Sequence, residues 1–371
     1  MLSGLKIIEL GGAGPVPYCG MLLADYGADV IRIGRAGGDP GHESSGNIMR
    51  RGKRIIGVNL KDPAGVDVVK KLIATADVVL DSHRPSVLER LGLDPQQCVQ
   101  TSPNLIFVRM SGWGQTGPLA HAPGHDINYL ALSGALHSIG DPDRPPTPPI
   151  AYMGDLGGGA VLAFAIASAA VSVRSGGQGG VIDASIYEAA MLLAGPFHAM
   201  VQTEEWSDTR GVNGIDGAAP FYRCYICADN RYIAVGALED PFFAKLLQLL
   251  ELSDKYMQTR WDKTAWPELT QTIAKKFAAH PRDFWARQET AVDACVSPVL
   301  TFTESFEHPQ VTERKTFVSI AGVSQPRPFA GLNNLSTVAS SQAENGRDIL
   351  AELGYSDGEM NSLSSSGTVT F

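Results

Sequence analysis

The sequence has few charged residues, and its charge balance is acidic. Of 371 residues, 19% are charged, and 39 acidic side chains against 30 basic ones give a net charge of −9. A protein that binds nucleic acid needs a basic face, so we predict no nucleic-acid partner. Apolar residues make up 44% of the chain, which is typical of a folded globular protein and not of a disordered one.

Cysteine is also scarce, and it is scattered along the chain. The five residues are Cys19, Cys98, Cys224, Cys227 and Cys295. An odd, dispersed set indicates a reducing compartment instead of a disulfide framework. The pair at 224 and 227 has C-x-x-C spacing, but it lies in a predicted strand and lacks the two further ligands that a zinc site requires. We therefore predict packed free thiols and no metal.

Targeting segments are missing as well. The first residues, MLSGLKIIELGG, contain no basic region followed by an apolar core and a cleavage site, and the chain ends TVTF instead of an SKL-type address. Residues 156–173 form the longest apolar run, but they are rich in Gly, Ala and Ser, which favours a packed helix over a membrane span. We expect a cytoplasmic protein without a membrane partner.

The first half of the chain alternates between short apolar runs and segments with helical spacing. This rhythm predicts an α/β domain with a Rossmann-like parallel sheet. The turn GGAGPV after the first run does not complete the dinucleotide pattern G-x-G-x-x-G, because Pro17 stands where the third glycine is expected. The predicted strands are 6–10, 29–33, 55–60, 76–80, 105–110 and 181–184, and the predicted helices are 18–26, 63–75, 156–173 and 186–198.

The length of the chain predicts two domains. Composition changes near residue 200, where a polar, glycine-containing stretch begins. The following segment FYRCYICADNRYIAVGA alternates on both sides of Ala228-Asp229-Asn230, which predicts a β-hairpin. We assign 1–200 to a large α/β domain, 201–219 to a linker and 220–329 to a smaller α+β domain.

Basic residues cluster after the second and third predicted strands. In an acidic protein, such loops could form a cradle for phosphate groups, or they could be a solvated basic surface. The sequence leaves both interpretations open. The residues are Arg32, Arg35, Arg50, Arg51, Lys53, Arg54 and, further along, Arg84.

Two stretches, GHDINYL (124–130) and YMGDLGGG (152–159), carry side chains suited to proton transfer. Asp155 precedes three glycines at a predicted helix start, where free amides and the helix dipole favour an anion. It could be a simple N-cap, and His125 a structural histidine. In one pocket, however, an imidazole and a carboxylate would supply two proton-transfer groups of different pKa.

Several stretches taken together resemble the family III CoA-transferases, and within that group the α-methylacyl-CoA racemases of lipid metabolism. The resemblance runs in order from about residue 2 to about 330, whereas the last forty or so residues match poorly. It implies that 330–371 return to complete the large domain, and that two chains form an interlocked homodimer. The stretches are ELGGAGPVPYCGMLLADYGADVIRI, RGKRIIGVNLKDPAG, RPSVLERLGL, MSGWGQTGP, GHDINYLALSG, YMGDLGGG, APFYRCYICADNRYIAVGALED and DACVSPVL.

The resemblance also implies roles for individual residues. His125 and Asp155 would move a proton on and off the carbon next to the thioester, one from each face. Glu239 in GALED resembles a glutamate that pairs with this histidine across the dimer. It is followed by Asp240, where many relatives have proline.

Further residues would hold the substrate. Arg35 and Arg84, with Arg50 and Lys53 in addition, would bind the CoA nucleotide. Because CoA is part of the substrate, no separate cofactor is expected. The backbone amides of Gly154, Leu156 and Gly157 would stabilise the enolate oxygen.

Two other activities remain open on this resemblance. In a family III CoA-transferase, Asp155 would form an acyl anhydride with the substrate, whereas a silent relative would only bind acyl-CoA. The histidine in GHDINY favours the racemase. Met153, Met191 and Met200 could line an acyl pocket or simply fill the core.

Overall fold

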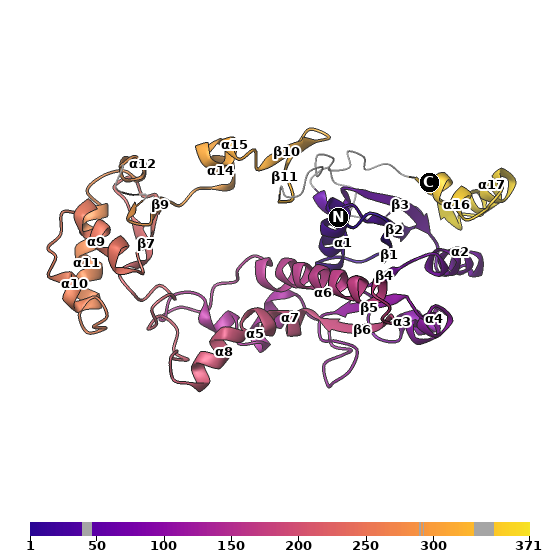
Figure 1. Cartoon of the computed structure of the whole chain (residues 1–371), viewed down its shortest axis with the longest axis horizontal. Helices are drawn as coiled ribbons and strands as arrows, with labels where there is room; N and C mark the ends of the chain where they lie inside the picture. The colour runs from indigo at the N-terminus through magenta and orange to yellow at the C-terminus, as the bar shows by residue number, and fades with distance from the viewer. Residues whose placement is uncertain (39–46, 289–290, 292, 330–344) are drawn as a thin grey trace. The chain divides into compact units, whose positions relative to one another are not determined.

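The computed structural model describes residues 1–38, 47–288, 291, 293–329 and 345–371 (Figure 1). These divide into two compact units. The first unit contains 1–133, 150–194 and 315–371, and the second contains 134–149 and 195–314. Part of the predicted returning segment, 330–344, lies outside the described residues.

These boundaries differ from the predicted ones at 200, 220 and 329. The predicted linker 201–219 lies inside the second unit, together with the proline-rich segment 134–149. The Arg210 guanidinium joins them by donating to the carbonyl oxygens of His137, Asp141 and Arg144 at 2.7–3.0 Å.

The described part of the first unit contains a seven-stranded sheet in the order β12-β3-β2-β1-β4-β5-β6 (Figure 1). All neighbouring strands are parallel except β12, which pairs with β3 in the antiparallel sense. The predicted parallel sheet is thus confirmed. The strands are β1 (Lys6–Leu10), β2 (Asp29–Arg35), β3 (Lys53–Val58), β4 (Val78–Asp81), β5 (Ile106–Ser111), β6 (Gly180–Ser185) and β12 (Val369–Thr370).

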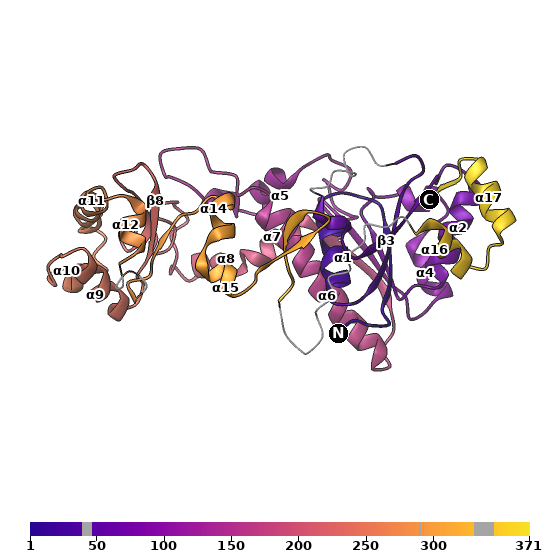
Figure 2. The same cartoon turned by 90° about the horizontal axis from the view of Figure 1, so that it is seen from above.

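Helices cover both faces of this sheet (Figures 1 and 2). One face carries α2 (Pro63–Ala74), α3 (Val87–Arg90), α4 (Pro95–Thr101), α16 (Gly346–Glu352) and α17 (Asp357–Ser365). The opposite face carries α1 (Pro15–Asp25), α6 (Gly157–Arg174) and α7 (Ile186–Leu193). The remaining elements of this unit are η1 (Ile48–Arg50), α5 (Asp126–Leu132), a π-helix η3 (Tyr152–Leu156), β10 (Phe317–Ile320) and β11 (Val323–Pro326).

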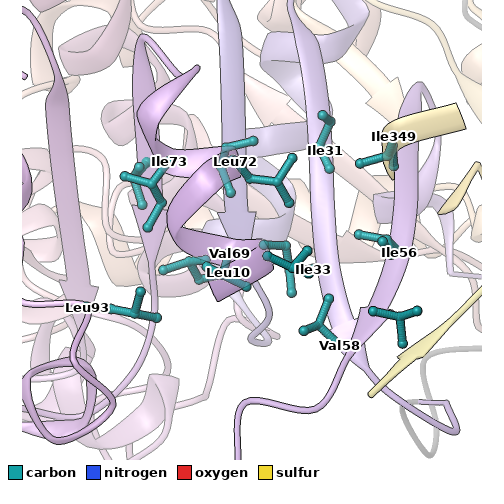
Figure 3. Close-up of a cluster of buried hydrophobic side chains, with 14 of the residues drawn as sticks. Leu10, Ile31, Ile33, Ile56, Val58, Val69, Leu72, Ile73, Leu93 and Ile349 are labelled. Atoms are coloured by element: carbon teal, nitrogen blue, oxygen red, sulfur yellow. The ribbon is translucent and has the colours of Figure 1, made fainter. Parts of the chain in front are cut away.

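Alternation along the strands separates the two cores. Ile8 and Ile31 point to the α2 face, whereas Ile7 and Val30 point to the α1 face. Figure 3 shows the first of these cores, in which the apolar stripe of α2 lies against the side chains of β1, β2 and β3. Because both faces are covered, the strands are apolar on both sides, as is usual for a parallel sheet.

The helix α6 has one buried stripe. Leu162 and Ile166 are almost fully buried against the α1 face, whereas Phe164 is 74% exposed and Val171 66%. Together with η3, this helix is long and apolar enough to cross a membrane by length and composition alone, and 28% of its most apolar window is buried within the protein.

The second unit has a three-stranded antiparallel sheet in the order β7-β8-β9, in its described part. The predicted hairpin is confirmed as β7 (Tyr222–Ile226) and β8 (Tyr232–Gly236). Its core is aromatic, with Phe221, Phe243 and Phe277 completely buried. The other elements are η2 (Leu136–Ser138), α8 (Gly195–Gln202), α9 (Asp240–Leu249), α10 (Tyr256–Thr259), α11 (Trp266–Phe277), α12 (Arg282–Ala286), β9 (Val296–Pro298), α14 (Phe302–Glu307) and α15 (Pro309–Glu313).

Two sequence-based expectations are wrong in detail. The predicted helix 186–198 is two helices, because the chain leaves the helical conformation at Ala194, and α8 begins anew with Gly195 and Pro196. The cysteines at 224 and 227 do not both pack: Cys227 is buried, but Cys224 is exposed on β7.

Candidate active site

The two motif stretches meet in one pocket of the first unit. This histidine pocket, of about 290 Å³, is lined by His125 at the start of α5, Asp155 in η3 and Arg84 after β4. The glycine turn after β1 also contributes, through Gly12 and Gly14. The expectation that His125 and Asp155 share one site agrees with this placement.

Each polar residue of the GHDINY stretch holds part of the pocket. Asn128 accepts a hydrogen bond from the His125 amide at 3.0 Å, and this fixes the start of α5. The Tyr129 hydroxyl donates to the carbonyl oxygen of Gly124 at 2.6 Å. Asp126 reaches furthest, because its Oδ1 accepts from the amide of Asp155 at 2.8 Å. The histidine stretch and the aspartate stretch are thus joined directly.

Glycines allow these close approaches. A Cβ on Gly154 would lie 2.3 Å from Oδ1 of Asp126, so a larger residue there would push the Asp126 carboxylate away. Gly14 has φ +70°, a conformation that favours glycine, and its Cβ would lie 3.3 Å from the Asp155 carboxyl. The turn after β1 is therefore packed against the candidate catalytic carboxylate.

The surroundings of Asp155 make its ionised form less stable than that of an exposed carboxyl. Burial raises its pKa above the ordinary carboxyl value, and the nearby negative charge of Asp126 raises it further, whereas His125 acts in the opposite direction. Burial, followed by the charge of Asp155, also raises the pKa of the Tyr129 hydroxyl. A carboxyl with a raised pKa accepts a proton more readily than an exposed carboxyl does, and it can return that proton to a substrate.

The prediction of an oxyanion site at Leu156 and Gly157 is wrong. Asp155 does not cap a helix, because the helix starts earlier as the π-helical turn η3. The amide of Leu156 donates to Ala151 O at 3.0 Å, and the amide of Gly157 donates to carbonyl oxygens within η3. The third predicted amide, that of Gly154, lies in the first turn of η3, where amides lack an intrahelical acceptor, but Gly154 is buried and lines neither pocket.

A larger pocket of about 980 Å³ lies at the carboxyl ends of β1, β2, β3 and β4. We call it the strand-end pocket. Its basic side chains are Arg35, as predicted, together with Lys61 and His83. Gly12, Ala13 and Ser82 line both pockets, so the two are neighbours.

The strand-end pocket occupies the crevice where ligands bind in open α/β sheets, since the chain order reverses between β1 and β4. Sequence reasoning missed Lys61 and His83 as pocket residues. The signal was their position shortly after the strands β3 and β4, close to the strand ends as is Arg35, the last residue of β2.

Lys53 and Arg50 do not line either pocket. Lys53 is 2% exposed, and its ammonium donates to Oε2 of Glu9 at 2.5 Å and to Pro17 O at 2.8 Å. The predicted role of Lys53 in nucleotide binding is therefore not supported: it starts β3 on the side of the sheet that faces α1. Burial lowers its pKa, which the charge of Glu9 opposes. Arg50 is half-buried in η1.

Glu239 lies in the second unit, exposed at the start of α9. The next residue, Asp240, forms an ion pair with Arg260, whose side chain is 2% exposed. The Arg260 guanidinium lies over the rings of Phe221 and Phe243 at about 5 Å. This anchor fixes the helix start beside Glu239, and Pro241 follows in the first turn. The three methionines of the predicted acyl pocket, Met153, Met191 and Met200, are half-buried and line neither pocket.

Comparison with known proteins shows the family of this chain. The sequence model of CoA-transferase family III matches residues 2–348. The chain belongs to this family. The family predicted from the motif stretches is thereby confirmed, and the match extends further toward the C-terminus than those stretches suggested.

Among the relatives of this family III chain are two proteins named alpha-methylacyl-CoA racemase. The one from Mus musculus is 38% identical and the one from Homo sapiens 37%, each over 98% of this chain and 96% of the relative. A succinyl-CoA–D-citramalate CoA-transferase of Chloroflexus aurantiacus is 34% identical over 67% of this chain and 64% of its own length. A solved CAIB/BAIF family protein from Brucella suis superposes with a TM-score of 0.81 at 26% identity, covering 95% of this chain and 99% of that one.

Proposed function

We propose that this protein is an α-methylacyl-CoA racemase, an isomerase that inverts the carbon next to the thioester of 2-methyl-branched acyl-CoA. The observation that carries the proposal is the presence of His125 and Asp155 in one pocket. Similarity to the racemases over nearly the whole chain supports it.

Inversion requires a proton to leave one face of the carbon and another to arrive on the opposite face. His125 and Asp155 act as the two bases, and each is the acid when the reaction runs toward it. The raised pKa of Asp155 allows this carboxyl to hold the proton between the two half-reactions.

The substrate's nucleotide occupies the strand-end pocket, where Arg35 and Lys61 face its phosphates. The thioester end reaches the histidine pocket past Gly12 and Ala13, which line both pockets. Arg84 lines the histidine pocket. CoA is thus part of the substrate, and we propose no separate cofactor.

The working protein in this proposal is a cytoplasmic, interlocked homodimer, in which Glu239 pairs with His125 of the partner subunit. Exposed apolar side chains of α6 and α7 support burial against a second copy: Phe164 is 74% exposed, and Val171 and Leu192 are 66% exposed. Light scattering should give twice the chain mass of 39.5 kDa. A mass of one chain at micromolar concentration would contradict the dimer.

The deciding experiment uses a single enantiomer of 2-methylacyl-CoA in D2O, with no other carboxylic acid present. A racemase incorporates deuterium at C2 while optical purity is lost. A transferase with Asp155 as nucleophile would instead require an acceptor acid and form a hydroxylamine-sensitive acyl-enzyme. A silent relative would bind the thioester and leave C2 unexchanged. Either of the last two results would overturn the proposal.

A further inference from the structure

We propose that His83, oriented by Asp81, is a specificity-determining contact for the phosphates of the CoA nucleotide, and that it makes substrate affinity fall with rising pH. This inference rests on the proposed function, since it assumes that the strand-end pocket receives CoA. It concerns a residue whose role neither the motif stretches nor the family resemblance assigns.

The geometry starts at the end of β4. Asp81 is its last residue and is completely buried. One carboxylate oxygen, Oδ1, accepts from both the backbone N and the ring Nδ1 of His83, each at 2.8 Å. The other oxygen, Oδ2, accepts from Nε of Arg109 at 3.2 Å. Both the backbone and one ring nitrogen of His83 are therefore held by a carboxylate that is itself fixed.

The hydrogen bond to Asp81 determines which ring nitrogen of His83 is available to a ligand. With Nδ1 turned toward Asp81, Nε2 lies on the opposite side of the ring. The His83 side chain is 30% exposed and lines the strand-end pocket. Nε2 is thus the polar atom of His83 that can meet a ligand.

The charges around His83 favour an anionic ligand. Arg35 from β2 and Lys61 after β3 line the same pocket. The negative charge of Asp81 is shared with Arg109, which also pairs with Glu89 of α3 at 2.6 Å. The turn after β1 lines the pocket with glycines and Ala13, which have no charged side chain and expose backbone atoms. The diphosphate and 3′-phosphate of CoA match this set.

Protonation of His83 changes what it offers. The imidazolium donates from Nε2, and hydrogen bonds from a charged donor to phosphate are about twice as strong as neutral ones. The neutral ring with its proton on Nδ1 presents a lone pair toward the phosphate, and this interaction is repulsive. Affinity for the nucleotide should therefore be higher with the charged ring than with the neutral ring.

The test is calorimetric binding of CoA and of 3′-dephospho-CoA between pH 5.5 and 8.5. The wild-type protein is compared with His83→Gln and with His280→Gln, a surface variant in the second unit that lines neither pocket. At pH 6 we expect His83→Gln to weaken CoA binding about tenfold, the size of one charged hydrogen bond. The ratio of variant to wild-type Kd should approach one at pH 8.5, while His280→Gln stays at one throughout. Dephospho-CoA removes the monoester whose own ionisation changes in this range and shows which phosphate His83 meets.

Turnover provides the second readout. His83→Gln should raise KM for 2-methylacyl-CoA and leave kcat unchanged. Both should be unaltered with the N-acetylcysteamine thioester, which has no nucleotide. Asp81→Asn should lose the same pH dependence, and if this buried variant fails to fold, His83→Gln still decides the question.

Equal Kd values for His83→Gln and wild type at pH 6 would overturn the inference. So would a lower kcat, or an equal loss with the truncated thioester, since either points to a structural role. Because CoA binding is measured without turnover, it stands apart from the racemase proposal. A protein that binds CoA with this pH dependence but exchanges no C2 proton would refute the proposed reaction alone.

Discussion

Two groups of charged side chains lie within the first unit, and their carboxylates differ in whether they are paired with cations. In the buried triad, both oxygens of Glu9 pair with cations, Arg32 and Lys53, and the Glu9 side chain is completely buried. In the histidine pocket, Asp155 is half-buried and forms no ion pair with any residue that the structure describes. Two charged groups act on its pKa: the carboxylate of Asp126, which raises it, and His125, which lowers it.

This difference distinguishes a carboxylate that stabilises the fold, Glu9, from one that is suited to exchange a proton, Asp155. A carboxylate with both oxygens paired gains little from taking up a proton, whereas burial without a cation leaves Asp155 ready to exchange one. The triad also serves the pocket, because Arg32 donates to Gly12 O at 3.1 Å, in the turn that brings Gly14 against Asp155.

Breaking the triad should have the largest effect. Glu9→Ala leaves Arg32 and Lys53 buried without their partner, which should lower the free energy of unfolding by about 3–5 kcal/mol. Urea denaturation measures this loss. The matched control is Glu352→Ala, which removes an exposed partner of Arg54 and should cost less than about 1 kcal/mol. Equal losses in the two variants would show that the triad gives no special support.

Removing a base from the histidine pocket should affect catalysis and not folding. His125→Ala should slow deuterium exchange at C2 by at least about a hundredfold, the usual contribution of a general acid–base group. The melting temperature should stay close to that of the wild type, because His125 is exposed. His121→Ala, four residues earlier on the same surface segment and in neither pocket, is the control. Near-normal exchange in His125→Ala would rule out the two-base mechanism.

A smaller effect should follow from Asp126, which influences Asp155 through position and through charge. Asp126→Ala removes the acceptor of the Asp155 amide and should lower kcat about tenfold, in line with one lost hydrogen bond. Asp126→Asn keeps an oxygen acceptor and should retain most of kcat.

Both Asp126 variants remove the negative charge that raises the pKa of Asp155. The acidic limb of the kcat/KM profile should therefore move to lower pH in each of them. An unshifted limb in both variants would show that Asp155 does not set it.

The smallest expected effect is on stability. The folded protein holds the Asp155 proton more tightly than the unfolded chain, so the penalty for the ionised carboxylate is absent at low pH and appears as pH rises through the raised pKa. Asp155→Asn should therefore have a slightly higher melting temperature than the wild type at pH 7 to 8. The corresponding gain in the free energy of unfolding should be less than about 1 kcal/mol. The gap should close toward pH 4. A lower melting temperature for the variant at pH 7 would show that the ionised Asp155 carboxylate does not destabilise the folded protein.

Sequence reasoning succeeded where the pattern is local. Apolar runs predicted the parallel sheet, and alternation around Ala228 to Asn230 predicted the hairpin. Two short motifs led to His125 and Asp155, which line one pocket and whose catalytic role stays a prediction. It failed where the answer depends on strand register or on helix starts. Whether Lys53 faces solvent or α1 is decided by which residue begins β3.

The start of the helix near Asp155 shows the same limit. Glycines at 157–159 indicate a helix start, but the π-helical turn begins at Tyr152 and consumes the amides of Leu156 and Gly157. The contact of Asp126 with the Asp155 amide joins residues 29 positions apart. No periodicity along the chain contains that information.

The short strand β12 gives the strand-end pocket an unusual dependence on distant parts of the chain. Val369 pairs with Val58, Gly367 lines the pocket, and Thr368 bonds to Asp62, 306 positions away. Contacts this remote in sequence form late and slowly during folding. A ligand that fills the pocket binds only chains in which this closure is complete, and by mass action it stabilises them against unfolding. Binding of the proposed nucleotide would therefore serve as an assay of whether the last strand has joined the sheet.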